Sequence, residues 1–325
     1  MHAPMAKENL TLSVPPDLKG KRLDQVVSAL CPGHSRSRIQ SWIRAGHVTV
    51  DGHRLRQREI LHGGEEICID AEYEDQQQGY SREDIPLAIV HADDYILVIN
   101  KPAGLVVHPG AGNREGTLLN ALLHHYPELD KVARAGIVQR LDKDTSGLMV
   151  IARTPTAHTC LVEQLQRRSI TREYQAVVAG VLTAGGTVDA PLGRHPVQRT
   201  RMAVRESGRS AVTHYRVIRR FRAHTHILCR LETGRTHQIR VHMAHIHHPL
   251  VGDPVYGGRP RFPKGVSQAL REQLETFPRQ ALHASRLELI HPATGLQVGW
   301  ESPLPEDMQR LLAALDEDER SAHGN

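Results

Sequence analysis

The segment VQRLDKDTSG, residues 138–147, concentrates polar side chains in one short stretch of this 325-residue chain. Its polar members include Arg140, Asp142, Lys143, Asp144, Thr145 and Ser146. The apolar run that follows, residues 148–152, predicts a buried strand. A dense polar turn held against a buried strand is typical of a place where a protein positions reacting groups. On these residues alone an alternative stays open, in which Asp and Arg pair with each other and the hydroxyls cap a turn.

The sequence around this segment predicts more strands than helices. Strand-like runs lie at residues 87–90, 96–100, 174–179, 226–231 and 287–290, and amphipathic helices fit residues 117–125 and the segment after Thr154-Pro155. Because the strands come in clusters instead of alternating regularly with helices, a doubly wound parallel sheet is disfavoured. We expect an α+β domain on a mixed, mainly antiparallel β-sheet with flanking helices.

The front of the chain is basic. Residues 19–59 hold nine Lys and Arg against three Asp and Glu, an excess of six, whereas the whole chain has a net charge of +5. Apolar residues at helical spacing and later strand-like runs predict a small module there. A local basic excess indicates a polyanion partner. The candidate RNA-binding residues are Lys21, Arg22, Arg36, Arg38 and Arg44. The alternative is a charged, solvated helix face on a structural domain.

The usual cofactor motifs are missing from the sequence. Neither G-x-x-x-x-G-K-[ST] nor a G-x-G-x-x-G that opens a helix is present, so we expect no nucleotide cofactor. His242, His245, His247 and His248 crowd one segment, but no Glu follows the first His as in the zincins. Histidines beside arginines fit packing or phosphate contacts at least as well. We therefore expect no metal and no other cofactor.

The cysteines and the apolar runs indicate a compartment. Cys31, Cys68, Cys160 and Cys229 lie far apart without C-x-x-C spacing, which favours reduced thiols. The N-terminus has no apolar signal region, and no stretch approaches transmembrane length. We expect a cytoplasmic protein with no membrane partner. Nothing in the sequence argues for a dimer, so a monomer is expected.

Five blocks in a fixed order resemble a known family. RLDKDTSGLMV, residues 140–150, looks like the signature of the RluA/RluD family of pseudouridine synthases. The other blocks are NKPAGLVVHPG at 100–110, ITREYQAVVAG at 170–180, LETGRTHQIRVHMAHIHHPLVGDPVYGG at 231–258, and RQALHA with a following HP at 279–292. Within that family the chain is most similar to the RluD type. One departure is Gln139, where family members commonly have His before the RLD triplet; Asp142 itself is in place.

The front module also carries a resemblance. RLDQ at 22–25, SRSRIQSWI at 35–43 and GHVTVDG at 46–52 are similar to the α-L RNA-binding module of ribosomal protein S-four. Together the resemblances imply the pseudouridine synthase fold, with a central active-site cleft, behind a small RNA-binding domain. The expected organisation is a flexible lead-in at 1–17, the RNA-binding domain at 18–75, a linker at 76–83, the catalytic domain at 84–312 and an acidic tail at 313–325.

The family resemblance implies roles for individual residues. It implies that Asp142 is the catalytic carboxylate, that Arg235 forms an ion pair with it, and that Tyr174 lies against the flipped uracil. It further implies that Ile239 forms the apolar wall of the base pocket and that Arg140 fills the gap left in the RNA. Lys101, Arg240 and Arg201 are candidate phosphate partners at the rim of the cleft, although each could equally be a solvated surface charge.

The implied reaction is the isomerisation of uridine to pseudouridine in RNA. It needs no redox change, phosphate or metal, in agreement with the missing motifs. The implied partner is 23S rRNA or a precursor of the large ribosomal subunit, with the helix 69 loop as the expected target. Two alternatives are a non-catalytic RNA-binding ribosome-assembly factor and a hydrolase that uses Asp142 and Asp144 as a pair. The second is disfavoured, because residues two apart on a strand point to opposite faces.

Overall fold

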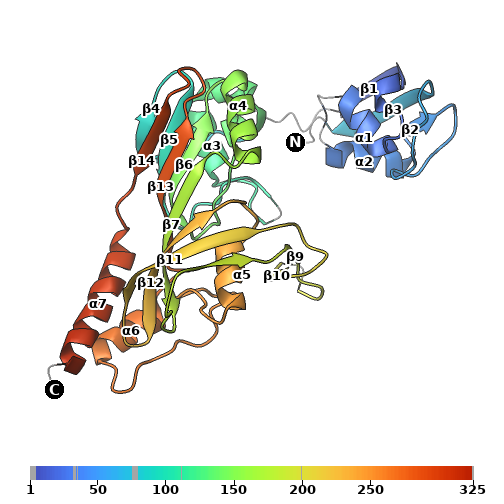
Figure 1. Ribbon diagram of the computed structural model, residues 1–325. Helices are drawn as coiled ribbons and strands as arrows, with labels where there is room; N and C mark the ends of the chain where they lie inside the picture. The colour runs from blue at the N-terminus through green and yellow to red at the C-terminus, as the bar shows by residue number, and fades with distance from the viewer. Residues whose placement is uncertain are drawn as a thin grey trace. The chain divides into compact units, whose positions relative to one another are not determined.

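The computed structural model of the protein describes residues 5–31, 34, 36–74, 80–110, 112–198 and 200–323. It divides into two compact units, residues 1–79 and 80–325 (Figure 1). The boundary falls beside the polar DQQQG sequence, and residues 75–79 of this segment lie outside the described residues. In the described ranges, no helix combines the length and the apolar character that a membrane crossing requires.

The N-terminal unit is a three-stranded antiparallel sheet covered by two helices. Its elements are β1 (Met5–Ser13), η1 (Pro16–Leu18), α1 (Leu23–Leu30), α2 (Arg36–Ala45), β2 (Val48–Val50) and β3 (Glu66–Glu74), with the strand order β1-β3-β2. The apolar stripe of α1 is buried with Ile39 and Trp42 of α2, and Ile67 and Ile69 of β3 face the same core. The predicted small module is confirmed in its helices and strands.

The prediction of a flexible lead-in is wrong for residues 5–13. They form strand β1, which pairs with β3 along its whole length, from Met5 opposite Glu74 to Ser13 opposite Glu66. The alternation of Leu10 and Leu12 with polar neighbours is a strand signal that the sequence does carry. Residues 1–4 of the predicted lead-in lie outside the described residues.

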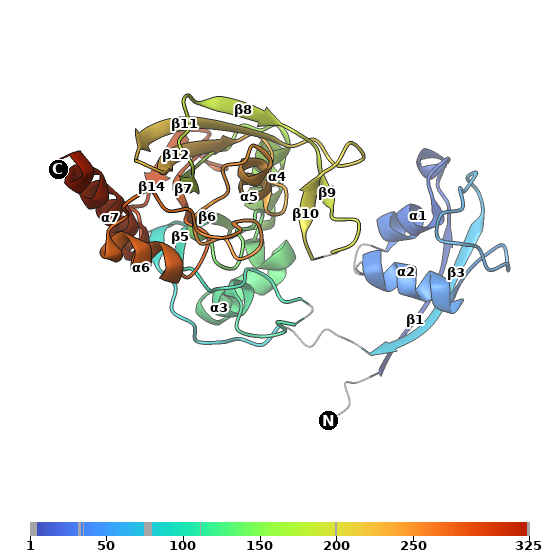
Figure 2. The same ribbon diagram turned by 90° about the horizontal axis from the view of Figure 1, so that it is seen from below.

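The C-terminal unit is built on one large sheet. Its strands are β4 (Ile89–Ala92), β5 (Ile96–Lys101), β6 (Ser146–Ala152), β7 (Thr171–Ala179), β8 (Gly186–Asp189), β11 (Val212–Arg220), β12 (His224–Leu231), β13 (Leu282–Ile290) and β14 (Gln297–Glu301). The order is β4-β5-β6-β13-β7-β12-β11-β8, with β14 added on β13 (Figures 1 and 2). Only the β6–β13 pair is parallel among the described strands, so the predicted mixed, mainly antiparallel sheet is confirmed.

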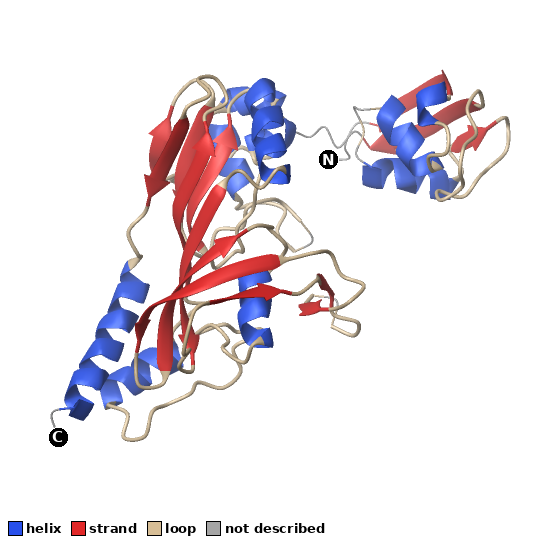
Figure 3. Cartoon of the chain, in the orientation of Figure 1, coloured by secondary structure: helices blue, strands red, loops and turns tan. Residues whose placement is uncertain are grey.

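Helices cover both faces of this sheet (Figure 3). They are α3 (Leu118–His125), η2 (Pro127–Lys131), η3 (Ala133–Gly136), α4 (Pro155–Gln166), α5 (Gln238–His245), α6 (Gln268–Thr276) and α7 (Glu306–His323), and β9 (Leu192–Arg194) pairs with β10 (Met202–Val204) in a separate hairpin. Leu97 and Ile99 of β5 pack with α3 and α5, whereas Ile96 and Val98 pack with α4. This burial on both sides explains why β5 and β6 read as continuous apolar runs.

The predicted acidic tail is also wrong in part, because residues 306–323 form helix α7. Met308, Leu311 and Leu315 recur on one face of α7 and are buried against α6. Asp318, within the acidic run, is buried and accepts a hydrogen bond from Arg222 Nη1 at 2.9 Å. The tail is therefore a packed part of the C-terminal unit up to His323.

Candidate active site

The polar segment at 142–145 forms a turn that leads directly into buried strand β6. The backbone N–H of Thr145 donates to the carbonyl of Asp142 at 3.1 Å, and every residue of β6 is buried. Gln280 Nε2 donates to the Thr145 hydroxyl at 3.0 Å and ties the turn to the segment before β13. Asp142 and Asp144 thus belong to a turn and not to a strand, so strand alternation does not separate them. The predicted polar turn against a buried strand is confirmed.

Asp142 is held by a buried ionic network. Its Oδ2 accepts a hydrogen bond from Nη1 of Arg240 at 3.0 Å, while Arg240 Nε and Nη2 donate to the two carboxylate oxygens of Asp253 at 2.7 and 2.9 Å. The side chain of Arg240 is 5% exposed and that of Asp253 is fully buried, but that of Asp142 is 16% exposed. One arginine thus joins a structural carboxylate to a carboxylate that faces the cleft.

The electrostatics of this network favour its charged state. Burial on its own lowers the pKa of Arg240 and raises the pKa of Asp253, but their mutual hydrogen bonds and charges outweigh burial. The result is a raised pKa for Arg240 and a lowered pKa for Asp253. Asp253 also accepts from the backbone N–H groups of Val255 and Tyr256 at 2.9 and 3.0 Å. Arg240 is therefore a fixed cation beside Asp142.

Arg235 does not form the ion pair that was expected of it. It lies in the loop before α5, where its Nε donates to the carbonyl of Ser210 at 3.1 Å. Arg240 stands in the first turns of α5 (Gln238–His245) and reaches inward to Asp142. The physical reason is that α5 begins at Gln238. Arg240 lies within the helix and faces the core, whereas Arg235 lies in the loop before it and does not. Arg240 was expected at the rim as a phosphate partner, and its burial excludes that position.

Lys101 is not at the rim either. It is 1% exposed, and its ammonium donates to the carbonyls of Pro102, Leu105 and Lys143 at 2.7, 2.9 and 2.9 Å. All three protons are used within the chain, so none is left for a phosphate. Burial lowers the pKa of Lys101 to about 7, against the opposing charges of Asp144 and Asp142. Its contact with Lys143 clamps the turn that carries Asp142.

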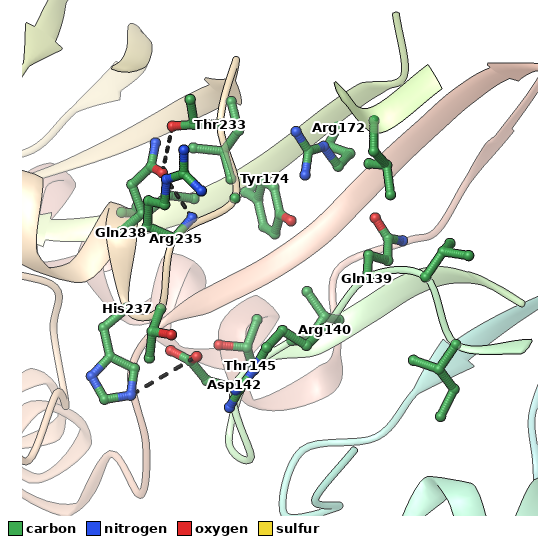
Figure 4. Close-up of a pocket in the computed structure, with 18 of the residues that line it drawn as sticks. Gln139, Arg140, Asp142, Thr145, Arg172, Tyr174, Thr233, Arg235, His237 and Gln238 are labelled. Carbon is green, nitrogen blue, oxygen red and sulfur yellow. Dashed lines mark hydrogen bonds and ion pairs between the residues drawn. The ribbon is translucent and has the colours of Figure 1, made fainter. Parts of the chain in front are cut away.

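A cleft of about 790 Å³ opens beside Asp142. Tyr174 of β7 and Ile239 of α5 line it, are largely buried, and belong to the same apolar core. Figure 4 shows Tyr174 between Asp142 and Arg172, with its ring against the cavity. Burial raises the pKa of the Tyr174 hydroxyl, and Asp142 adds to this rise while Arg172 opposes it. This phenol therefore stays protonated at neutral pH.

His237 lies on the other side of Asp142. Its Nε2 is 4.0 Å from Asp142 Oδ1, and its Nδ1 lies 2.9 Å from the hydroxyl of Tyr256 (Figure 4 shows the former). The residue has φ 56° at the N-cap of α5, a left-handed conformation that is costly for a side chain with a Cβ. Burial lowers the pKa of His237, against the opposing charge of Asp142. Sequence reasoning did not single out His237.

The cleft is strongly positive. Its lining includes six arginines (Arg134, Arg140, Arg168, Arg172, Arg235 and Arg240) and two acids (Asp142 and Glu232). Both acids are paired, Asp142 with Arg240 and Glu232 with Arg168. Four lining arginines are thus left without an acidic partner among the described residues. Such a surface attracts a polyanion.

The remaining candidate residues fall in different places. Arg140 is exposed and lines the cleft, and Arg201 contacts the carbonyl of Val255 and the Tyr256 ring. In the N-terminal unit Lys21 and Arg44 are exposed, and Arg22 is half-buried and pairs with Asp24 at 3.1 Å. Arg38 is half-buried on α2, while the side chain of Arg36 lies outside the described residues.

The histidine-rich segment behaves as packing. His242 is buried, with Nδ1 2.9 Å from the Thr213 hydroxyl and Nε2 3.0 Å from the carbonyl of Ala190. Nδ1 of His248 lies 3.0 Å from the carbonyl of Ala179. These contacts engage both ring nitrogens of His242 and one of His248 within the fold.

Three further site residues were missed by sequence reasoning: Asp253, Arg172 and His237. Asp253 stands in the quoted GDPVYGG block. Its partner Arg240 lies 13 positions earlier in the chain, so the sequence alone does not show that the two side chains meet. Arg172 stands two residues before Tyr174 in a strand, so the period of two does place both on one face. That spacing was the one available signal for Arg172.

Comparisons with known proteins agree with this geometry. The RNA pseudouridylate synthase family model matches residues 95–245, and the S4 domain model matches residues 21–67. The chain is 60% identical to ribosomal large subunit pseudouridine synthase D of Pseudomonas aeruginosa, over 96% of this chain and 97% of that protein. It is 57% identical to the protein of the same name in Escherichia coli strain K12, over 95% of each chain.

Solved structures show the same catalytic fold. The structure of human RNA pseudouridylate synthase domain containing 4 aligns with a TM-score of 0.56 at 26% identity, over 70% of this chain and 93% of that one. Human RNA pseudouridylate synthase domain containing 1 aligns with a TM-score of 0.53 at 23% identity, over 72% and 96%. The sequence relatives cover 95–96% of this chain, and the two solved structures cover 70–72% of it. The chain therefore belongs to the RNA pseudouridylate synthase family and carries an S4 domain ahead of its catalytic domain.

Proposed function

We propose that this enzyme isomerises specific uridines to pseudouridine in 23S rRNA, within the large ribosomal subunit or its precursor, and that its target is the helix 69 loop. The support is the 57–60% identity, across almost the whole of both chains, to enzymes named for the large ribosomal subunit. The resemblance of the front module and of the catalytic blocks to the RluD type supports the choice of the loop. A monomeric enzyme without a cofactor is part of the proposal.

One observation carries the chemical part of the proposal. Asp142 is a partly exposed carboxylate that a buried Arg240 holds at the wall of a cleft, where four lining arginines have no acidic partner among the described residues. Nη1 of Arg240 donates to Oδ2 of Asp142 at 3.0 Å, and Oδ1 of Asp142 lies 4.0 Å from Nε2 of His237. An RNA drawn in by the arginines would meet this carboxylate, which is one of the two acids in the described lining of the cleft.

In this proposal Asp142 supplies negative charge to the sugar. The bond between the anomeric carbon and uracil nitrogen breaks, and the sugar gains oxocarbenium character that an adjacent carboxylate stabilises. The uracil then turns in the pocket, and its ring carbon forms the new bond to the anomeric carbon. That ring carbon loses its proton to water, and the ring nitrogen freed from the sugar takes up a proton. No oxidant, phosphate donor or metal enters this balance.

The walls of the cleft suit an extruded base. The Tyr174 ring offers an aromatic face for a uracil, and Ile239 offers an apolar contact beside it. A stacked nucleotide hides its glycosidic bond, so the base must leave the helix, at a cost of a few kcal/mol. Exposed Arg140 stands two residues before Asp142 in sequence and would fill the gap in the RNA. Lys21 and Arg44 of the S4 domain would add phosphate contacts.

Tritium release tests the function directly. Large-subunit rRNA carrying tritium on the uracil carbon that is rejoined to the sugar is incubated with wild type, Asp142→Asn and Asp144→Asn. We expect release by wild type, a loss of at least about 10³-fold for Asp142→Asn, and near wild-type release for Asp144→Asn. The Asp144 variant is the matched control, because it removes a carboxylate from the same turn. Mapping of the modified uridines identifies the target.

The other outcomes separate the alternatives. Tight binding without tritium release from rRNA or from isolated large subunits would contradict the enzymatic proposal and favour an assembly factor. Release of free uracil or cleavage of the chain, lost in both Asp142→Asn and Asp144→Asn, would favour the hydrolase. Pseudouridine at a large-subunit site outside the helix 69 loop would contradict only the proposed target.

A further inference from the structure

Arg172 is a buried arginine that has no acidic partner. The residue is 8% exposed, and its Nε is shielded from solvent without a hydrogen-bond partner. In the part of the chain that the structure describes, no hydrogen bond or ion pair engages its guanidinium. Buried arginines are normally paired, because the charged group loses its hydration. The protein therefore holds an uncompensated cation in the wall of its cleft.

The position of Arg172 follows from strand β7 (Thr171–Ala179). Arg172, Tyr174 and Ala176 alternate with more exposed residues, so Arg172 and Tyr174 share the face toward the cleft. Figure 4 shows the guanidinium beside Tyr174, on the side away from Asp142. The cation thus lines the same cleft as Asp142, with Tyr174 between them.

The nearby acids are engaged elsewhere. Glu173 is the neighbour in sequence, but it faces the opposite side of β7, where its charge acts on Arg286. Glu232 lines the same cleft and is paired with Arg168 and with His214, the latter at 2.7 Å. No described acid is therefore left to neutralise Arg172.

The fold leaves room for this side chain. A Cβ on Gly234 would lie 2.8 Å from Nη1 of Arg172, so the guanidinium occupies the space that any larger residue at 234 would take. Gly234 belongs to the loop that also carries Arg235 and lines the cleft. The absence of a side chain at 234 thus lets the guanidinium rest against the backbone at this end of the cleft.

We propose that Arg172 is a phosphate-binding residue, which receives a backbone phosphodiester of the RNA next to the extruded uridine. This inference rests on the proposed RNA substrate. A phosphodiester carries the full negative charge that the buried cation lacks, and its two oxygens match the fork of a guanidinium. A uracil carbonyl is neutral and would leave the charge uncompensated. Arg172 then anchors the strand while Tyr174 and Asp142 act on the base.

The test compares Arg172→Met with Arg168→Met on a stem-loop RNA of the helix 69 sequence. Both variants remove one arginine from the cleft lining, but Arg168 already has its partner in Glu232. For Arg172→Met we expect KM and Kd to rise about 10- to 100-fold, with kcat within about threefold of wild type. Arg168→Met should stay within about threefold on both parameters. Arg172→Lys should recover part of the affinity, because it keeps the charge without the fork.

Single methylphosphonate linkages identify the phosphate. Neutralising one linkage beside the target uridine should weaken wild-type binding about tenfold or more and leave Arg172→Met binding unchanged at that linkage. Gly234→Ala, which displaces the guanidinium, should raise KM in the wild-type background and have no further effect in Arg172→Met. The melting temperature of free Arg172→Met should equal or exceed that of wild type.

Three results would overturn the inference. One is an equal KM for Arg172→Met and Arg168→Met. Another is that no single methylphosphonate linkage weakens binding by wild type while leaving binding by Arg172→Met unchanged. The third is a lower melting temperature of Arg172→Met, which would make Arg172 a structural residue. Failure of wild type to release tritium would count against the proposed function instead, because the Kd and methylphosphonate measurements test Arg172 without turnover.

Discussion

Two buried arginines stand at opposite ends of the same cleft and differ in their partners. Arg240 contacts Asp142 and Asp253 through three hydrogen bonds of 2.7–3.0 Å. Arg172 contacts no acid among the described residues, although its exposure is also below a tenth. The protein satisfies one cation completely within its own fold and leaves the other for a ligand.

This difference in partners assigns different roles to the two arginines: Arg240 positions Asp142, and Arg172 binds the anionic substrate. A guanidinium clamped by Asp253 cannot reorient, so it fixes the carboxylate of Asp142 for chemistry. An unpaired guanidinium costs the free protein stability, and an anionic substrate recovers that cost on binding. Truncation of Arg240 should therefore lower the stability of the free protein. The same truncation of Arg172 should leave that stability unchanged or higher and should weaken the binding of the RNA.

The largest expected effect is at the paired end. Arg240→Met leaves Asp253 buried without its cation, and we expect a loss of about 3–5 kcal/mol in the free energy of unfolding. Activity should fall at least about 10²-fold in whatever fraction folds, because Asp142 loses its fixed partner. Denaturant unfolding and tritium release measure the two effects. The double variant Arg240→Met/Asp253→Asn should recover part of the stability but none of the activity.

The same truncation at the unpaired end should spare stability. Arg172→Met removes a buried charge without leaving another one behind, so the free energy of unfolding should be unchanged or higher. Denaturant unfolding beside Arg240→Met checks this. A loss of stability similar to that of Arg240→Met would remove the difference between the two ends.

Sequence reasoning captured six of the nine described strands of the large sheet, because their apolar runs are bounded by polar turns, and it missed β8, β11 and β14. It also placed Asp142 correctly in a polar turn before β6. It exchanged the positions of Arg235 and Arg240, since both stand in one quoted block and only the start of α5 decides which of them faces Asp142. It placed Lys101 at the rim, because a buried lysine with three carbonyl partners has no sequence signature.

The two elements that were missed at the chain ends had readable signals. Leu10 and Leu12 alternate with polar residues in β1, and Met308, Leu311 and Leu315 recur at helical spacing in α7. The acidic run at 316–319 obscured the second of these signals. Arg172 lies between these cases, because the strand period placed it on the cleft face but only the structure shows that no acid meets it.

His108 reports on the positive charge of the cleft, and the change in stability expected from it is smaller than that expected for Arg240→Met. It lines the cleft, and burial together with Arg134 and Arg140 lowers its pKa to about 4. Between pH 6.5 and 4 the unfolded chain binds the proton and the folded one does not, so His108 costs stability as the pH falls through this window. Wild type should lose more stability there than His108→Gln, as measured by denaturant unfolding at each pH.

Bound RNA should sharpen this result. Phosphates near Arg134 and Arg140 would offset their charges, so the pKa of His108 should rise in the complex. A histidine titration followed by NMR with and without RNA measures the change. An unchanged pKa would indicate that no phosphate reaches these arginines.

The smallest expected effect concerns the S4 domain. Lys21→Ala/Arg44→Ala should raise KM on full-length rRNA about two- to tenfold and leave kcat unchanged, because exposed side chains that bind phosphates add affinity but no chemistry. The slope of log Kd against log salt should fall by about 0.7 for each RNA phosphate that the variant no longer binds. Lys7→Ala is the control, since Lys7 pairs with Asp70 and Glu72 on the sheet. An equal effect per charge removed in both variants would make the contribution one of net charge alone.

The most direct test of the two-ended cleft is tritium release over a range of RNA concentrations, with Asp142→Asn and Arg172→Met side by side. We predict that Asp142→Asn stays inactive at every concentration, whereas Arg172→Met approaches the wild-type kcat once the RNA is saturating. A lowered kcat with an unchanged KM for Arg172→Met, or turnover by Asp142→Asn, would contradict the assignment of chemistry to one end and anion binding to the other.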